Sequence, residues 1–363
     1  MANRDIIVIG ASAGGLAAIE KIVKDLPADF RGSILIVWHM SPDVGGFVAQ
    51  LLGKLTPLSV TQAKEGEALA AGCIYVAKPD FHLLIVDEKI HLSRGPKENR
   101  FRPAVDPLFR SAAYCYGNRV IGVILSGGLD DGTAGLWSIK QYGGIAIVQD
   151  PHDAEVSSMP ESAMRQVSID HSVPADAIAA LLVRLSKEST ESTTAPSGEQ
   201  TLTEISIAAG NIPNIKATIT FGVLTPFTCP ECHGVLSKLN DGSIVRYRCH
   251  TGHAYSVDTL MQAVTEKIEA SLYSAMRGMD ESVMLLNHIG DHLAENNDPA
   301  LAGIYFTKAR EAHDRSCSVA ETIKEHQLIS TEAVRKDASL PLASACPLEP
   351  VNYLEKLSSG EKV

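Results

Sequence analysis

Three apolar segments of this sequence end beside side chains that can carry out acyl transfer. Residues 6–9 run into a glycine-rich turn that contains Ser12, residues 34–38 run into His39, and residues 120–125 run into a loop that contains Asp130 and Asp131. Each segment is typical of a strand buried on both faces in a parallel sheet. Because the carboxyl ends of parallel strands meet at one edge, we expect these side chains to lie together. A serine, a histidine and an aspartate form the catalytic set of many hydrolases.

The turn around Ser12 has the form Gly-x-Ser-x-Gly, which predicts a nucleophile on a sharp strand-to-helix turn. The helix that follows would point free N–H groups at the same place, where an oxyanion can bind. Serine needs a base, and His39 can take that role, with Asp130 or Asp131 orienting its ring. Glycine-rich turns also bind phosphate, but Ser12 stands where the dinucleotide fingerprint has its second glycine.

The first half of the chain alternates strand-like and helical segments. Short apolar runs such as 145–148 alternate with helical stretches such as 106–116 and 133–142. This alternation predicts a doubly wound α/β fold with a mostly parallel sheet. We therefore assign residues 1–186 to a catalytic domain.

Further regions follow this domain. Residues 187–222 are polar, which predicts a flexible linker, and residues 223–258 contain a Cys/His unit. Residues 259–335 have apolar side chains at helical spacing, and the turn at residues 296–299 predicts a helical hairpin there. Residues 336–363 are expected to form a loose tail. We expect the catalytic domain to keep its activity without the residues after about 190.

The Cys/His unit has the spacing of a metal site. Two short knuckles, at residues 229–232 and 249–253, supply cysteines and histidines. Four such ligands suit tetrahedral Zn²⁺, so we expect a structural zinc ion in a zinc-ribbon-like unit. The expected ligands are Cys229, Cys232, Cys249 and His253, with His250 as the competing fourth ligand. The alternative is a former zinc ribbon or a redox pair, and catalysis itself is expected to need no cofactor.

Composition limits the possible partners and locations. The chain has 363 residues, a formal net charge of −11 at pH 7 and 7 cysteines. The negative charge argues against nucleic-acid binding, and no apolar run is long enough for membrane insertion. The first residues lack the apolar core of a signal peptide, and an odd cysteine count argues against a disulfide framework. We expect a cytoplasmic protein, and the sequence leaves its oligomeric state open.

Residues 5–185 resemble the catalytic domain of CheB, the bacterial chemoreceptor methylesterase. Motifs at residues 9–15, 38–42, 100–109, 125–135 and 158–163 stand in the order found in that family. The resemblance implies a catalytic triad of Ser12, His39 and Asp131, and so it selects Asp131 over Asp130. It also implies that glutamate γ-methyl esters on methylated chemoreceptors are hydrolysed to release methanol, as a step of chemotaxis signalling.

The same interpretation assigns supporting roles. Backbone N–H groups near Ala13, Gly127 and Gly128 would hold the oxyanion. Arg100 and Arg102 either help to place the receptor or are surface arginines without a role. The chemistry extends to glutamine deamidation, because an amide and an ester present the same carbonyl. Two other functions stay open: a non-enzymatic chemosensory scaffold and a nucleotide-binding α/β module.

The sequence departs from the CheB pattern in its motifs and in its domain content. Ala13 replaces the threonine that usually follows the serine, and Gly128-Leu129 replaces a Met-Gly pair before the aspartates. The receiver domain typical of CheB is missing from this sequence, so we expect no control by a phosphoaspartate within the chain. The Cys/His unit resembles an element appended to some stand-alone CheB-like proteins.

Overall fold

The computed structural model describes residues 2–40, 46–190, 198–211 and 222–326. The chain divides into two compact units, Met1–Ser271 and Leu272–Val363. The tail expected at residues 336–363 lies outside the described residues. None of the helices in the described ranges combines the length and the apolar composition that crossing a bilayer requires.

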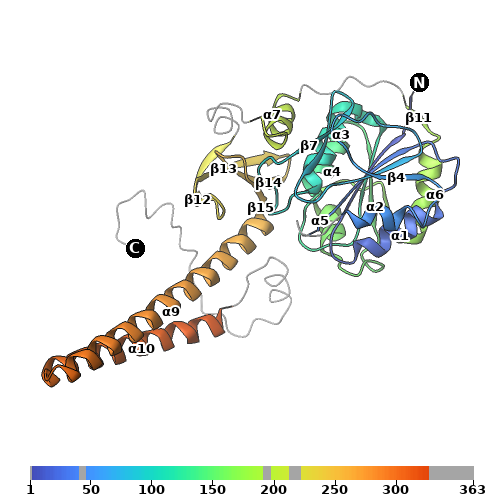
Figure 1. The fold of residues 1–363 in the computed structure, drawn as a ribbon. Helices are drawn as coiled ribbons and strands as arrows, with labels where there is room; N and C mark the ends of the chain where they lie inside the picture. The colour runs from blue at the N-terminus through green and yellow to red at the C-terminus, as the bar shows by residue number, and fades with distance from the viewer. Residues whose placement is uncertain (1, 41–45, 191–197, 212–221, 327–363) are drawn as a thin grey trace, which may run out of the picture. The chain divides into compact units, whose positions relative to one another are not determined.

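A seven-stranded parallel sheet forms the centre of the first unit (Figure 1). Its strands lie in the order β10-β9-β8-β2-β3-β5-β4. The strands are β2 (Ile6–Ala11), β3 (Ser33–Trp38), β4 (Ser59–Gln62), β5 (Cys73–Val76), β8 (Val120–Ile124), β9 (Ile145–Gln149) and β10 (His171–Val173). From β2 the chain continues to β3 on one side and returns to β8 on the other. This doubly wound order confirms the predicted fold class and places a switch point at β2, where such sheets bind ligands.

Helices cover both faces of the sheet (Figure 1). On one face lie α1 (Gly15–Asp25), α2 (Phe47–Leu52) and α6 (Ala175–Leu185), and on the other α3 (Val105–Tyr116), α4 (Thr133–Gln141) and α5 (Ser158–Gln166). Successive residues of a strand point to opposite faces. Ile7 and Ile9 therefore join one core and Val8 the other, and all three are fully buried. This two-sided burial explains the continuous apolar runs of the sequence.

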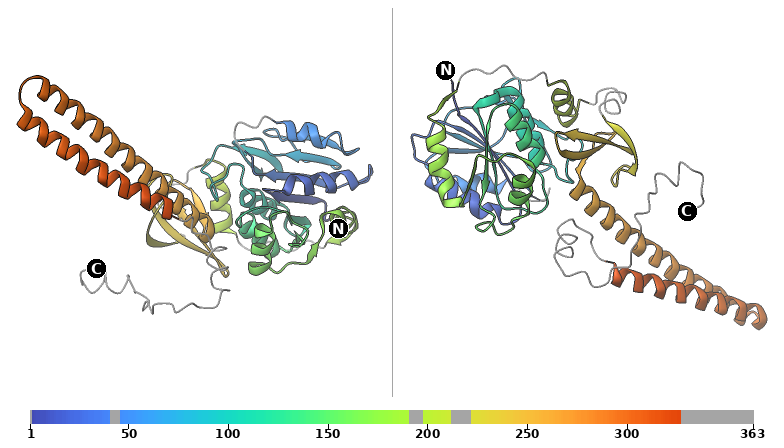
Figure 2. Two further views of the ribbon diagram at one scale, coloured as in Figure 1. Left: turned by 90° about the horizontal axis from the view of Figure 1, so that it is seen from below. Right: turned by 180° about the vertical axis from the view of Figure 1, so that it is seen from behind.

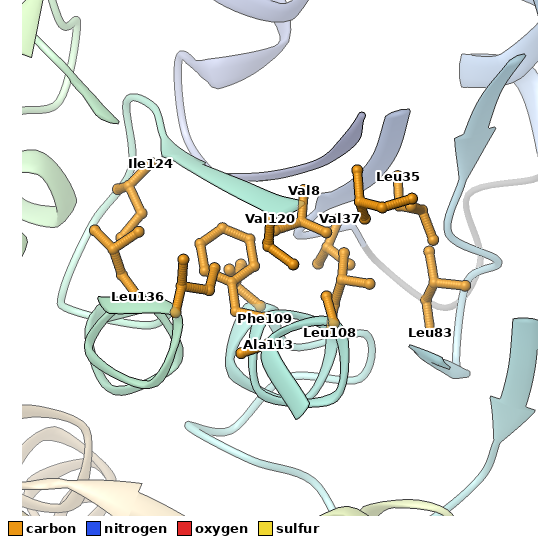
Figure 3. Close-up of a cluster of buried hydrophobic side chains, with 14 of the residues drawn as sticks. Val8, Leu35, Val37, Leu83, Leu108, Phe109, Ala113, Val120, Ile124 and Leu136 are labelled. Carbon is orange, nitrogen blue, oxygen red and sulfur yellow. The ribbon is translucent and has the colours of Figure 1, made fainter. Parts of the chain in front are cut away.

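The core on the α3 side fixes the position of the segment that leads to the site. Figure 3 shows Val8 and Val37 of the sheet facing Leu108 and Phe109 of α3. Burying each such side chain contributes about 1.5–3 kcal/mol. The approach is closest at Gly10, where a Cβ atom would lie 2.3 Å from Cγ1 of Val105. The first turn of α3 is therefore held against the end of β2.

Part of the range predicted to be a flexible linker, residues 187–222, is folded as helix α7. Within that range, β11 (Ser189–Thr190) pairs with β1 (Ala2–Asn3), and α7 spans Glu199–Ala208. Ile205 and Ala208 of α7 pack against Leu84 of the hairpin formed by β6 (His82–Val86) and β7 (Lys89–Ser93). Most of the residues between Ser189 and Ala208 that the structure describes are therefore part of the folded unit. A short 3-10 helix, Gly117–Arg119, leads into β8.

The Cys/His unit is a four-stranded antiparallel sheet. Its strands are β12 (Val223–Thr228), β13 (Val235–Asp241), β14 (Ile244–Cys249) and β15 (Ala254–Ser256). One knuckle joins β12 to β13 and the other joins β14 to β15. Helix α9 (Val257–Glu295) starts directly after β15. In the second unit α9 and α10 (Pro299–Glu325) run side by side (Figure 2), and Asp298 caps α10 by accepting a hydrogen bond from Leu301 N at 3.1 Å.

Buried ion pairs join α7 and the antiparallel sheet to the catalytic domain. Glu98 accepts from Arg110 of α3 at 3.1 Å and from Arg248 of β14 at 2.9 Å. Glu204 of α7 accepts from Arg246 at 2.8 Å and from Arg248 at 3.0 Å. Burial alone would raise the pKa of Glu98, but the charges of Arg110 and Arg248 lower it to about 2. Each charge in this cluster is therefore stable in the interior only while its partners are present.

We predict that Glu204→Ala destabilises the first unit by about 3–5 kcal/mol, because it leaves three buried arginines, Arg110, Arg246 and Arg248, with only the carboxylates of Glu98 and Asp241. Glu199→Ala, at an exposed position of the same helix, should change stability by less than about 0.5 kcal/mol. Urea unfolding of both variants and the wild type measures the difference. Equal stabilities of the two variants would mean that the cluster does not hold α7 in place.

Candidate active site

The ends of three neighbouring strands bring the predicted catalytic residues to one edge of the sheet. Ala11 of β2 pairs with Trp38 of β3, and Ser12 and His39 follow these two residues. The loop after β8 carries Asp131, which stands just before α4. His39 N donates to Ala11 O at 3.0 Å, and the Trp38 indole donates to Ser12 O at 2.8 Å. The sheet register therefore determines the distance between the serine and histidine segments.

His39 is held between Asp131 and an aromatic ring. Its Nε2 atom lies 2.7 Å from Asp131 Oδ2, and both side chains are almost fully buried. The ring of Phe101 stacks on the imidazole with centroids 3.7 Å apart and planes 11° from parallel. Nδ1 is buried and has no hydrogen-bond partner among the described residues. Because Nε2 donates its proton to Asp131, Nδ1 is the nitrogen left to act as a base.

The carboxylate of Asp131 accepts several hydrogen bonds. Besides His39, its Oδ2 accepts from Val105 N at 2.7 Å, and its Oδ1 accepts from Asn99 Nδ2 at 2.8 Å and Gly132 N at 3.0 Å. Burial raises the pKa of this carboxyl, but the hydrogen bond from His39 and those from Val105 and Asn99 outweigh it, so the pKa is lowered. The carboxylate is therefore ionised and able to stabilise an imidazolium ion.

Asp130 has a different environment. Its Oδ1 accepts a hydrogen bond of 2.6 Å from Ser256 Oγ, at the end of β15. Burial, together with the negative charges of Asp258 and Asp131, raises the pKa of Asp130 to about 7. The structure thus places Asp131 against His39, whereas Asp130 contacts the Cys/His unit.

Ser12 opens onto a cavity of about 450 Å³. His39, Phe101, Arg100 and Arg102 also line this cavity. Arg102 is already paired with Asp80, at 2.6 and 2.9 Å, and Arg100 is paired with Glu266 of α9 at 2.5 Å. The cavity is therefore bordered by ion pairs rather than by isolated positive charges.

The residues expected to bind the oxyanion have different backbone partners. The Gly127 N–H donates to Val156 O at 3.0 Å, and its role at the oxyanion stays a prediction. Gly127 also matters for space, because a Cβ atom there would lie 2.8 Å from the Ser12 Cβ and 2.1 Å from the Met159 sulfur. The N–H groups of Ala13 and Gly128 have no acceptor among the described residues. They stay candidates for this role.

The Cys/His knuckles bring four ligand atoms together. Cys229, Cys232, Cys249 and His253 offer atoms that all lie within 4.8 Å of one another. The distance between the Cys232 and Cys249 sulfurs is 3.6 Å, and His253 Nδ1 lies 3.5 Å from the Cys249 sulfur and 3.7 Å from the Cys229 sulfur. Sulfur ligands about 2.3 Å from one tetrahedral ion lie about 3.8 Å apart. The cluster therefore has the dimensions of a metal site, and His253 rather than His250 belongs to it.

Comparison with known proteins assigns the catalytic domain. A family model described as CheB methylesterase matches residues 7–182. A protein from Leptospira interrogans is 41% identical over 190 residues, which cover 52% of this chain and 98% of that protein. This chain belongs to the CheB methylesterase family. The hydrolase prediction is thereby confirmed, and this supports it over the scaffold and nucleotide-binding alternatives.

Other members of the CheB family also match about half of this chain. A Thermotoga maritima relative, named protein-glutamate methylesterase/protein-glutamine glutaminase, is 36% identical over 184 residues, covering 50% of this chain and 54% of that protein. The crystal structure of the Thermotoga maritima CheB methylesterase catalytic domain is 35% identical and covers 51% of this chain and 100% of that chain, with a TM-score of 0.48. The family match ends at residue 182, before α7 and the Cys/His unit.

Two residues around the predicted triad were missed in the sequence. Phe101 packs on the imidazole and Asn99 donates to Asp131, yet neither stands at a strand end. Both lie in the segment before α3, and both Asn99 and Arg100 have positive φ values, of 49° and 75°. An asparagine tolerates this backbone region better than most residues, but that preference indicates a turn rather than a site.

We predict that Asp131→Asn reduces ester hydrolysis by roughly 10³-fold or more, because an amide nitrogen would face the donors that now converge on the carboxylate. Asp130→Asn should reduce it by less than about 10-fold, since Asp130 does not touch His39. Initial rates of methanol release from a methylated receptor measure both. A larger loss for Asp130→Asn would overturn the choice of Asp131.

Proposed function

We propose that Ser12, His39 and Asp131 hydrolyse glutamate γ-methyl esters on methylated chemoreceptors. The observation that carries this proposal is the 2.7 Å contact between His39 Nε2 and Asp131, which leaves Nδ1 as the only ring nitrogen able to take the Ser12 proton. Family membership supplies the class of reaction, a carboxylic ester hydrolysis. A role in chemotaxis is consistent with it, and the cytoplasmic location stays a prediction.

The reaction proceeds by acyl transfer. His39 Nδ1 removes the proton of Ser12 as Oγ attacks the ester carbonyl, and the negative charge of Asp131 stabilises the imidazolium ion that forms. The oxyanion binds near the N–H group of Ala13, next to the serine. The imidazolium then gives its proton to the leaving methoxide, and methanol departs. A water molecule, deprotonated at Nδ1, releases the glutamate carboxylate and restores Ser12.

The same site accounts for a second activity, the deamidation of glutamine. The Thermotoga maritima relative carries protein-glutamine glutaminase in its name. An amide presents the same carbonyl to Ser12, and the imidazolium would protonate departing ammonia instead of methoxide. The amide is the less reactive acyl group, so we propose deamidation as the slower of the two reactions.

Arg100 and Arg102 are proposed to place the substrate. Their guanidinium groups border the cavity beside Ser12, and their partners Glu266 and Asp80 hold them in position. Arg102 also donates to Arg94 O at 3.2 Å and to Gly95 O at 2.9 Å, so one of its five N–H donors is left for a receptor segment, whereas Arg100 has several beyond its bond to Glu266. Both can therefore bind a carbonyl or carboxylate group without breaking their ion pairs.

We predict that Ser12→Ala abolishes methanol release, with a loss of roughly 10³-fold or more, because no other group can form the acyl intermediate. The assay uses a chemoreceptor that carries radiolabelled methyl esters. Ser186→Ala at the end of α6, whose hydroxyl donates to Val183 O, is the matched control and should behave as wild type. Hydrolysis by a folded Ser12→Ala protein at the wild-type rate would refute the proposed mechanism.

We further propose that Cys229, Cys232, Cys249 and His253 hold a structural zinc ion. The four ligand atoms would fill a tetrahedral shell, which leaves no open position for a catalytic water. Two of the cysteines, Cys229 and Cys249, are fully buried, and the cluster joins β12–β13 to β14–β15. The metal would therefore stabilise the fold of the Cys/His unit.

We predict about one zinc ion per purified chain, to be measured by elemental analysis without chelators. Cys229→Ser should lower this content, because it removes a thiolate ligand. Removing zinc should also raise hydrogen exchange in β13–β14 before it does so in the central sheet, because site binding energy contributes to folding. A metal-free preparation with full protection of β13–β14 would argue against a structural site.

A further inference from the structure

The end of the Cys/His unit reaches the carboxylates behind the triad. Ser256 closes β15 and precedes α9, and its hydroxyl donates to Asp130 Oδ1 at 2.6 Å. Its N–H donates to Asn99 Oδ1 at 3.0 Å. Ser256 is 7% exposed and Asn99 is 3% exposed, so water does not replace these partners readily. Ser256 lies outside the region that the family model matches. It thus contacts both Asp130, which precedes Asp131 in the chain, and Asn99, which is hydrogen-bonded to Asp131.

Asn99 transmits this contact to Asp131. Its amide nitrogen donates to Asp131 Oδ1 at 2.8 Å and to Asp106 Oδ2 at 2.8 Å. Its oxygen accepts from Ser256 N and from Thr259 Oγ1, the latter at 3.3 Å. A primary amide has one accepting and one donating end, so the Ser256 N–H at the oxygen directs the nitrogen toward the carboxylates. The extension therefore determines which end of Asn99 faces Asp131.

The backbone keeps Ser256 in register with this segment. Asn99 N donates to Ala254 O at 2.8 Å, and Ala254 N donates to Lys97 O at 3.2 Å. The buried pair of Arg248 and Glu98 lies beside this bridge, at 2.9 Å. Thr259 N also donates to Ser256 Oγ at 3.0 Å, which caps the first turn of α9. Several independent contacts thus hold Ser256 at one place relative to Asp130.

We propose that Ser256 is a positioning residue for ester hydrolysis and that the Cys/His unit completes the active site through it. Ser256 and Thr259 orient Asn99, Asn99 and Asp130 hold the loop of Asp131, and Asp131 orients His39. This inference rests on the proposed hydrolysis at Ser12. It replaces the expectation that the catalytic domain keeps full activity without the residues after about 190.

The role differs from that of a stabilising contact. A misplaced Asp131 weakens the stabilisation of the imidazolium ion, which forms after substrate has bound. Ser256 does not line the cavity beside Ser12. Loss of the Ser256 hydroxyl should therefore lower kcat and leave KM nearly unchanged.

The test compares Ser256→Ala with Ser271→Ala, the same chemical change farther along α9. The Ser271 hydroxyl is exposed and donates to Lys267 O within its own helix. We expect Ser256→Ala to lower kcat by about 10-fold with KM within about twofold of wild type. Ser271→Ala should match wild type, and Ser256→Thr, which keeps the hydroxyl, should recover most of the lost rate.

The proton resonance of His39 Nε2–H provides a readout that partial unfolding does not imitate. This resonance, identified by its loss in His39→Gln, should lie downfield in wild type and shift in Ser256→Ala. If Ser256→Ala fails to fold, Thr259→Val removes the hydroxyl that contacts both Ser256 Oγ and Asn99 Oδ1, and it should act in the same direction. Equal kcat values for Ser256→Ala and Ser271→Ala, or a lower kcat with an unshifted resonance, would overturn the proposal. A wild type no more active than Ser12→Ala would instead refute the proposed function, while the resonance comparison stays interpretable.

Discussion

The carboxylate of Asp131 is a buried negative charge, and burying such a charge is costly unless donors surround it. The chain supplies donors from His39, from Asn99 and from the backbone at Val105 and Gly132. Much of the local architecture follows from that need. Helix α3 must begin at Val105, close to the loop after β8, and Gly10 leaves room for this approach because a Cβ there would clash with Val105.

Buried ion pairs also join the Cys/His unit to the catalytic domain. Glu98 and Arg110 of the catalytic domain pair with each other, Arg248 of β14 pairs with Glu98, and Glu204 of α7 pairs with Arg110 and Arg248. Such a cluster resists separation, since each half would leave unpaired charges in a dry environment. The Cys/His unit is therefore held against the loop that contains Asp130 and Asp131. If Ser256 has the positioning role that we propose, activity depends on the integrity of the Cys/His unit.

Sequence patterns predicted the central sheet because strands buried on both faces give unbroken apolar runs, as at residues 120–125. They placed Ser12 and His39 for the same reason, since both directly follow such runs. Helix α7 was missed because its buried face includes the charged residue Glu204. The buried charge of Glu204 is balanced by arginines that are distant in the sequence. The roles of Asn99 and Ser256 depend on a contact between residues far apart in the chain, which no local spacing reveals.

The most direct test of this account is the protonation of the two His39 ring nitrogens, read from ¹⁵N NMR shifts of histidine-labelled protein at a pH where the ring is neutral. The hydrogen bond to Asp131 requires a proton on Nε2 and a bare Nδ1. We expect this tautomer in wild type and its loss in Asp131→Asn. A proton found on Nδ1 in the wild type would contradict the account, because Nδ1 could then not accept the proton of Ser12 and a bare Nε2 could not donate to Asp131.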